Sequence, residues 1–460
     1  METAMNKRRE EDSLGPVWVA GDVYYGSQTQ RAVENFPISS TPFPHAVILA
    51  MVRIKRLAAG VHQYLDLLPG EIAGAIVQAA QEVESGAMGD QFPVDVYQTG
   101  SGTSSNMNVN EVLAGRANEI LTGKRGGKHP VHPNDHVNLG QSSNDVVPSA
   151  VHIACLTSLD DDLLPALKIL HASLEKQAKA LQPVLKTGRT HFMDALPVRV
   201  GQEFGGYARQ VELAMERIQG VYPRLGELAL GGTGVGTGLN AHPDMARRVV
   251  RKLAEETGLP FTRAKSRFEA MGARDALVEL SCVLKTLAVG LMKIASDIRL
   301  MACGPRCGIG EIRLPALQPG SSFMPGKVNP VLPESVLQVG ARVIGNDATA
   351  AVCGHMGSLE LNTMIPVLAQ CVLESIKLLA SSSRAFAEKC IDGLEADEIR
   401  CRDMLDQSTG LATLLVPDMG YDQAAELARE AHESGKTVRE LAMEKGLLSA
   451  REWKDLLEGL

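Results

Sequence analysis

The sequence predicts a mostly α-helical protein whose core is a bundle of long helices. Aromatic residues are only 4% of the chain, so the core must be built mainly from Leu, Val, Ile, Ala and Met, which favours helix packing over a β-sandwich. Residues 334–351 and 366–380 have helical spacing and begin at or near Pro, which suits a first helical turn. Residues 268–303 carry a coiled-coil-like seam with steps of three and four, formed by Leu277, Leu280, Leu284, Leu287, Leu291, Ile294 and Ile298.

The 460 residues suggest about three domains. We expect an N-terminal domain over 1–141, a central helical bundle over 142–395 and a small C-terminal helical domain over 396–460. Long helices with apolar seams need partner helices on several sides, so we expect the bundle to be completed across subunits.

The elements follow from local composition. Residues 7–12 mix charges of both signs and are expected to form a solvated tail, and 13–45 are rich in turn formers. Residues 46–85 read as helices, and 91–145, rich in Gly, Ser, Asn and Pro, read as long loops. The long helix of 268–303 should stop at Gly304 and Pro305. Short helices are expected over 422–434, 437–445 and 450–457, between turn-forming residues.

Charge and hydropathy exclude several classes of partner. The net charge is −8 and there is no long basic run, so no nucleic acid is expected to bind. The longest uncharged stretches are broken by Pro or rich in Gly and polar residues, so no membrane partner is expected. The first sixteen residues lack an apolar core and contain several acids, so we expect a cytoplasmic protein.

No cofactor motif is found. Cys303 and Cys307 have no partner pair at metal-binding spacing, so no metal site is expected. The glycine-rich stretch GGTGVGTG at 231–238 does not match a dinucleotide-binding loop and lies among predicted helices. We therefore expect chemistry that needs no cofactor.

Three polar segments could build a site. Residues 320–330, GSSFMPGKVNP, place two Ser beside Lys327 between flexible glycines, as a catalytic lid would. In the second segment, 187–203, Thr190 and His191 are expected to precede a helix, and Glu334 is a carboxylate that could orient the histidine. The third segment is a pair of Ser- and Asn-rich clusters. It offers neutral donors next to a helix start, where an anion is favoured: Ser101, Thr103, Ser142, Ser143 and Asn144. Together the segments describe a site for a small polyanion.

These segments resemble the fumarase/aspartase superfamily. GSSFMPGKVNP is similar to its signature loop. TGSGTSSNMNVNEV, HPNDHVN, GQSSND, GRTHFMDALPVRVGQEF and LALGGTGVGTGLNAHP resemble class II fumarate hydratases, and the likeness runs from about residue 21 to about residue 448. It implies a three-domain subunit, with the first domain the family's N-terminal lyase domain. Four such subunits would form a homotetramer with a twenty-helix core and active sites shared by three subunits.

The resemblance also implies residue roles in the reversible hydration of fumarate to (S)-malate without a metal. Ser321 would be the base at carbon, Lys327 would stabilise an aci-carboxylate intermediate, and His191 with Glu334 would handle the proton on the water side. The substrate dicarboxylate would be held by Ser101, Gly102, Thr103, Ser142, Ser143, Asn144, Thr190, Ser322 and Asn329. A second, non-catalytic dicarboxylate site would be formed by His132, Pro133, Asn134 and Asp135.

Two alternatives remain open within this resemblance. Aspartate ammonia-lyases share the loop and the carbanion chemistry, but Ser143, Gly326 and His191 favour a fumarase, whereas His136 is also found in aspartases. A non-catalytic structural member of the superfamily need not keep the site, yet Ser321, Lys327 and Glu334 are all present.

Overall fold

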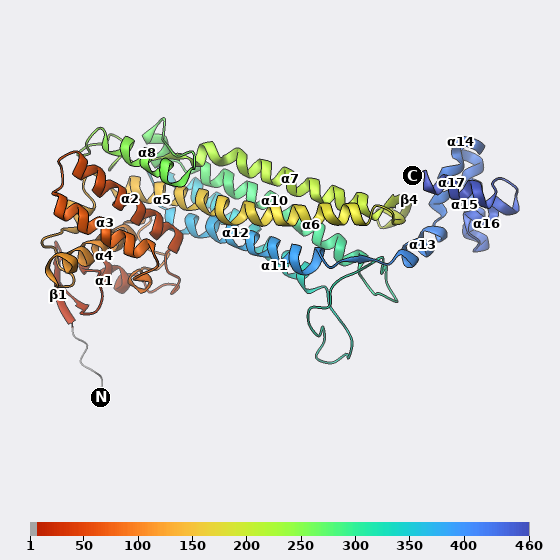
Figure 1. Cartoon of the computed structure of the whole chain (residues 1–460), viewed down its shortest axis with the longest axis horizontal. Coiled ribbons are helices and arrows are strands. Elements are labelled where there is room, and N and C mark those ends of the chain that lie inside the picture. The colour runs from red at the N-terminus through yellow and green to blue at the C-terminus, as the bar shows by residue number, and fades with distance from the viewer. Residues whose placement is uncertain (1–6, 460) are drawn as a thin grey trace. The chain divides into compact units, whose positions relative to one another are not determined.

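The computed structural model describes residues 7–459. Residues 1–6, which belong to the first sixteen residues that are expected to hold no targeting signal, lie outside the described residues. The predicted mostly helical architecture is confirmed (Figure 1). Where the chain is described, its strands form two-stranded sheets, in the pairs β1–β2, β3–β4, β5–β6, β7–β10 and β8–β9.

The chain divides into two compact units. The first contains the described part of Met1–Leu164 together with Glu216–Thr286 and Ala341–Leu379. The second contains Pro165–Met215, Leu287–Gly340 and the described part of Ala380–Leu460. Four long helices continue from one unit into the other, namely α7 (Val200–Leu225), α10 (Asp275–Met301), α11 (Val331–His355) and α12 (Ile365–Phe386).

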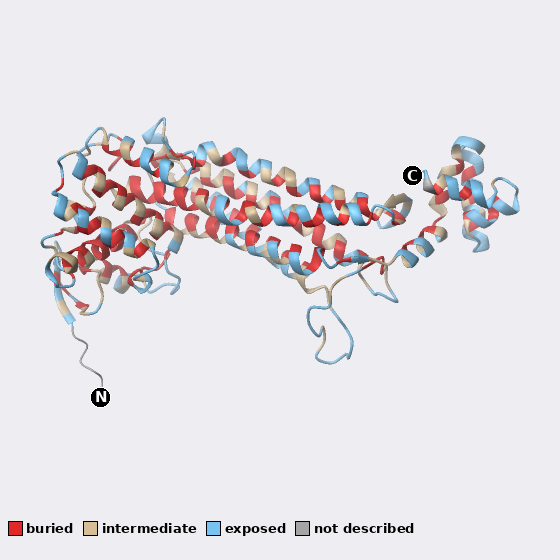
Figure 2. Cartoon of the chain, viewed as in Figure 1, coloured by how far each residue is buried: buried red, intermediate tan, exposed pale blue. Residues whose placement is uncertain are grey.

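The long helices lie side by side. In the first unit Ser281 of α10 donates a hydrogen bond of 2.9 Å to Asp347 of α11, and Asn346 of α11 donates one of 3.1 Å to Ser375 of α12. In the second unit Tyr207 of α7 donates to Asp297 of α10 at 3.0 Å. All seven residues of the predicted seam on α10 are buried, so the periodicity identified a core face. Buried and exposed residues alternate along these helices (Figure 2).

The first unit contains both predicted helices of residues 46–85, α2 (His45–Tyr64) and α3 (Gly70–Glu84). Its other helices and turns are α1 (Ser27–Asn35), η1 (Gly89–Gln91), α4 (Thr103–Thr122), η2 (Pro133–Val137), α5 (Ser143–Ser158), η3 (Leu159–Leu163), α8 (Met245–Thr257) and α9 (Arg267–Gly272). Its strands are β1 (Lys7–Asp12), β2 (Gly15–Ala20), β5 (Glu227–Leu228), β6 (Thr262–Arg263), β8 (Gly357–Ser358) and β9 (Leu361–Asn362).

Two predictions for this unit are wrong. Residues 7–12 are not a solvated tail but strand β1, antiparallel to β2, in which Glu10 is buried and pairs with Arg8 at 2.7 Å. The predicted loop of 91–145 contains the 20-residue helix α4, of which 13 residues are buried. The buried asparagines of this helix are tolerated because groups distant in the sequence accept hydrogen bonds from their amides. For example, Asn108 Nδ2 donates to Gln91 O at 2.9 Å.

The second unit contains the hairpin of β3 (Leu185–Thr190) and β4 (Met193–Arg199), and α6 (Leu164–Ala180) apart from its first residue. Its remaining elements are β7 (Ile312–Arg313), η4 (Ala387–Ile391), β10 (Glu395–Ala396), α13 (Glu398–Gln407), η5 (Thr409–Leu415), α14 (Val416–Met419), α15 (Tyr421–Ser434), α16 (Val438–Glu444) and α17 (Ala450–Glu458). The three predicted C-terminal helices correspond to α15, α16 and α17.

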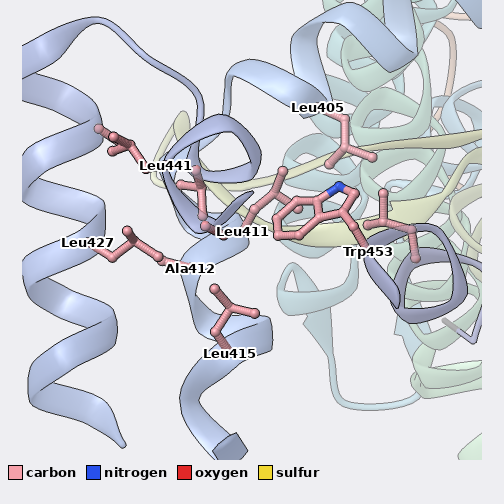
Figure 3. Packing of buried hydrophobic residues seen from close by; sticks show 11 residues of the cluster. Leu405, Leu411, Ala412, Leu415, Leu427, Leu441 and Trp453 are labelled. Carbon is pink, nitrogen blue, oxygen red and sulfur yellow. The ribbon is translucent and has the colours of Figure 1, made fainter. Parts of the chain in front are cut away.

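Residues from α13 onward share a hydrophobic cluster, against which Leu185 of β3 also packs. The Trp453 ring lies among Leu405, Leu411 and Leu441 (Figure 3). The segment Ile365–Ile391 is long and apolar enough to cross a membrane, with a mean hydropathy of 1.3, but 61% of its most apolar stretch is buried within the protein. Such burial is typical of a core helix.

Candidate functional site

The Ser- and Asn-rich clusters of the first unit meet in a chain of hydroxyl groups. Ser101 Oγ lies 2.8 Å from Thr103 Oγ1, and Thr103 Oγ1 lies 2.5 Å from Ser143 Oγ. Between them Gly102 has a φ of +75°, and a Cβ there would lie 2.7 Å from Val147 Cγ1, so this position requires glycine. Residues 40 positions apart in the sequence thus converge at the starts of α4 and α5.

The first turn of α5 is a capping box. Ser142 Oγ accepts from Asn144 N–H at 3.2 Å, and Asp145 accepts from Ser142 N–H at 2.9 Å. This helix begins at Ser143 and contains Pro148. The amide of Asn144 donates to Gly234 O at 2.9 Å, which ties the glycine-rich stretch 231–238 to the helix start. A helix N-terminus lined with neutral donors favours an anion.

Asp145 organises this part of the site, a role that the sequence interpretation missed. Its carboxylate is fully buried and also accepts from Gly231 N–H at 2.8 Å and Thr233 N–H at 3.0 Å. Burial raises the pKa of Asp145 to about 6, although its backbone donors favour the charged form. Buried Lys55 of α2 donates to Asn138 at 2.7 Å, and burial lowers its pKa to about 7 despite the attraction of Asp145. The sequence offers little signal for this lysine, because Arg53 and Arg56 flank it on the same helix.

The predicted second-site segment forms the start and body of the π-helix η2. His132 is its N-cap, and its Nδ1 accepts from the N–H groups of Asn134 and Asp135, both at 3.1 Å. That nitrogen therefore carries no proton, and the Asp135 carboxylate 3.4 Å away contacts a neutral ring. Burial lowers the pKa of His132, in keeping with a neutral ring. Pro133 is buried.

The expectation that Thr190 and His191 precede a helix is wrong. Thr190 ends β3, His191 and Phe192 form a two-residue turn with φ of +56° and +61°, and β4 follows. Two positive φ values match the twist of a tight hairpin, although the usual residues there are Asn and Gly. The helix begins only at Val200. His191 is exposed on this turn and lines a cavity of about 640 Å³ in the second unit.

Glu334 lies in the first turn of α11, where its N–H donates to Pro330 O at 3.2 Å. Within residues 7–459, no hydrogen bond or ion pair joins it to His191. The structure of one chain therefore does not form this predicted pair.

The loop 320–330 is closed on itself. Gly320 N–H donates to Lys327 O at 2.8 Å, and Asn329 Nδ2 donates to Gly320 O at 2.6 Å. A Cβ on Gly320 would lie 2.3 Å from Lys327 O, so the closure requires glycine. Ser322 and Lys327 are exposed on the loop.

Ser321 receives two backbone hydrogen bonds inside this loop. Its Oγ accepts from Phe323 N–H at 3.1 Å and from Met324 N–H at 2.8 Å. Two fixed N–H dipoles aimed at one oxygen stabilise negative charge on that oxygen. The serine hydroxyl is thus placed where its alkoxide would be supported.

Comparisons with known proteins identify the family of the chain. The lyase family model matches residues 15–345, and a model described as the fumarase C C-terminus matches residues 411–458. The chain is 49% identical to a class II fumarate hydratase of Methylorubrum extorquens and 53% identical to one of Halobacterium salinarum, covering 98% of this chain and 96% of each relative.

Solved structures are similar over almost the whole chain. A class II fumarase from Schistosoma mansoni matches with a TM-score of 0.95 at 38% identity, covering 98% of both chains. A fumarate lyase:delta crystallin from Brucella melitensis matches with a TM-score of 0.91 at 43% identity, covering 98% of this chain and 99% of that one.

Proposed function

The chain belongs to the class II fumarate hydratase family, and we propose that it is an active hydro-lyase, which interconverts fumarate and (S)-malate at the residues described above. The observation that carries the site assignment is the pair of backbone N–H groups on Ser321 Oγ. An ordinary hydroxyl is a poor acid or base at neutral pH, and these donors make its alkoxide accessible.

In the hydration direction, water attacks one alkene carbon while His191, oriented by Glu334, takes its proton. The electron pair of the double bond moves toward the other alkene carbon and onto the carboxylate attached to it. This carboxylate becomes an aci-carboxylate. Lys327 and Asn329 stabilise the added charge. The Ser321 hydroxyl then gives its proton to that second carbon and is left as the alkoxide. In the dehydration direction the alkoxide removes the same proton, and His191 returns its proton to the departing hydroxyl group, which leaves as water.

The substrate carboxylates are held by neutral donors in this proposal. Ser101, Gly102 and Thr103 precede or begin α4, and Ser142, Ser143 and Asn144 begin α5. Thr190 and Ser322 add further contacts to the substrate. The segment from His132 to Asp135 forms the separate dicarboxylate site, without a part in the chemistry.

The complete site is proposed to need several subunits, because His191 and Glu334 do not pair within one chain. Exposed aliphatic side chains on the core helices support a homotetramer, among them Val289 of α10 and Val352 of α11, which are 52% and 58% exposed. We also propose the division at 1–141, 142–395 and 396–460, the last supported by the hydrophobic cluster around Trp453. The enzyme is proposed to be cytoplasmic and to bind neither membranes nor nucleic acid.

The deciding experiment follows the ultraviolet absorbance of the fumarate double bond with purified protein and EDTA. (S)-Malate is given in one cuvette and L-aspartate in another. We expect absorbance to grow with malate alone. Growth with aspartate alone would identify an ammonia-lyase instead, and no growth in either cuvette from folded protein would favour a structural role.

A further inference from the structure

Strand β3, which ends at Thr190, carries two members of a cluster of four charged side chains. The cluster consists of Lys186, Arg189, Glu203 and Glu311 and is here called the four-charge cluster. Arg189 donates to Glu311 Oε1 at 2.7 Å, and Lys186 Nζ lies 3.1 Å from Glu311 Oε2 and 3.0 Å from Glu203 Oε1. Three of the four residues line the same cavity as His191. The proposed reaction gives none of them a role.

Glu311 is the fixed member of the four-charge cluster. Its side chain is fully buried, while those of Arg189 and Glu203 are 15% and 26% exposed. Its N–H donates to Met301 O at 2.9 Å, at the end of α10, and its carbonyl accepts from Asp397 N–H at 2.8 Å, at the start of α13. The carboxylate is therefore held by its own backbone, independently of the hairpin.

The hairpin is shaped to reach this carboxylate. Lys186 and Arg189 are three residues apart on β3, so in a regular strand they would face opposite sides. Here both long cationic side chains nevertheless reach Glu311, beside a register shift in which two residues of β4, Ala195 and Leu196, oppose Gly188 of β3. The shift needs Gly188, because a Cβ there would lie 2.6 Å from Leu196 O.

We propose that Glu311 is a positioning residue for the reaction: through Arg189 and Lys186 it fixes the end of β3, and so the place of Thr190 and His191. The turn that carries His191 is exposed and has only two residues, so its position follows that of Thr190 and Arg189. The inference rests on the proposed function, because it matters for turnover only if His191 moves the proton. A buried ion network often adds little to the free energy of unfolding. We therefore expect the four-charge cluster to act mainly on the orientation of the β3–β4 hairpin.

The test compares variants that remove one partner of the pair. Glu311→Gln and Arg189→Met should each lower kcat by about a hundredfold, the effect expected from a misplacement near 1 Å. The double variant should be no worse than Glu311→Gln alone, because the ion pair that Arg189→Met removes is one of the two that Glu311→Gln already breaks. Arg189→Lys, which keeps the charge but not the fork, should recover part of the loss.

Two controls separate positioning from folding. Arg313, two residues after Glu311, makes a comparable ion pair of 2.8 Å with Asp397, but its side chain is exposed. Arg313→Met should therefore leave kcat unchanged. Calorimetric titration with succinate, a saturated dicarboxylate that cannot be hydrated, counts the binding-competent sites. In Glu311→Gln the number of sites should stay that of the wild type while kcat falls.

The results distinguish the two proposals. An active wild type, a crippled His191→Asn variant and a Glu311→Gln variant with unchanged kcat would overturn the positioning role alone. So would a loss of kcat that matches the loss of succinate sites. A wild type inactive with fumarate, or a fully active His191→Asn variant, would instead overturn the proposed function. If Glu311→Gln does not fold, the intermediate kcat expected of Arg189→Lys still decides the matter.

Discussion

The Lys55 ammonium lies 2.7 Å from Asn138 Oδ1, in a part of the first unit where the lysine has no exposed surface. The same oxygen accepts from the amides of Asn106 and Asn110 at 3.3 and 3.2 Å. One acceptor, on the residue that follows η2, therefore joins α2 and α4.

This lysine should make stability depend on pH. Burial lowers its pKa from 10.5 to about 7, so between these values the unfolded chain binds more protons than the folded chain. Stability contributed through Lys55 should then rise with pH across this window, by at most about 1.4 kcal/mol per pH unit. Urea unfolding at several pH values should show that Lys55→Met has a smaller slope than the wild type. Equal slopes would mean that the lysine is not charged differently in the two states.

Replacing Ser321 should abolish turnover without affecting the fold. Ser321→Ala removes the oxygen that accepts from Phe323 and Met324 and should lower kcat by about a thousandfold or more, as for loss of a positioned proton-transfer group. Circular dichroism should be unchanged, because the loop is exposed. Ser85→Ala, at an exposed helix end, is the matched control and should keep full activity. Substantial residual activity would show that another group acts at carbon.

Replacing His191 should change the pH profile. His191→Asn should lower kcat by about a hundredfold or more and change the pH profile, because an amide cannot take up and return a proton as an imidazole does. His432→Asn, at an exposed position of α15, should leave both kcat and the profile unchanged. A His191→Asn profile that matches the wild type would place the proton elsewhere.

Two glycines at the ends of α4 offer a matched pair. Gly102 and Gly123 have φ of +75° and +71°, so an alanine at either site costs roughly 1–2 kcal/mol of backbone strain. Only at Gly102 would the Cβ meet a neighbour, Val147 at 2.7 Å, whereas nothing lies within 4 Å at Gly123. Gly102→Ala should therefore raise the KM for fumarate, and Gly123→Ala should lower stability alone. Steady-state kinetics beside urea unfolding would check this, and an unchanged KM in Gly102→Ala would separate Gly102 from substrate binding.

The sequence was sufficient to predict which faces of the apolar helices are buried. It was not sufficient to predict which polar residues are buried with hydrogen-bond partners from distant parts of the chain. The seam on α10 and the helices α2 and α3 follow from repeated apolar spacing, a signal that is local. Helix α4 was hidden because Asn106, Asn108 and Asn110 favour loops by local preference, and only distant acceptors reverse that preference. The turn at His191 was hidden because its residues are not those that usually take positive φ.

The candidate site divides in the same way. Its hydroxyls, Lys327 and His191 were visible because polar residues clustered in glycine-rich segments have few structural uses. Asp145 and Glu311 were not identified, because a buried carboxylate acts through partners that the sequence does not place beside it.

The three N–H groups on Asp145 also constrain how this chain could be recombined with its relatives. Residues 142–145 and 231–234 depend on one carboxylate, so neither segment has a conformation that is independent of the other. A crossover between them would pair segments from two parents that never adapted to each other. Functional chimaeras should therefore keep both segments from one parent, and their viable junctions should lie before residue 142 or after residue 234.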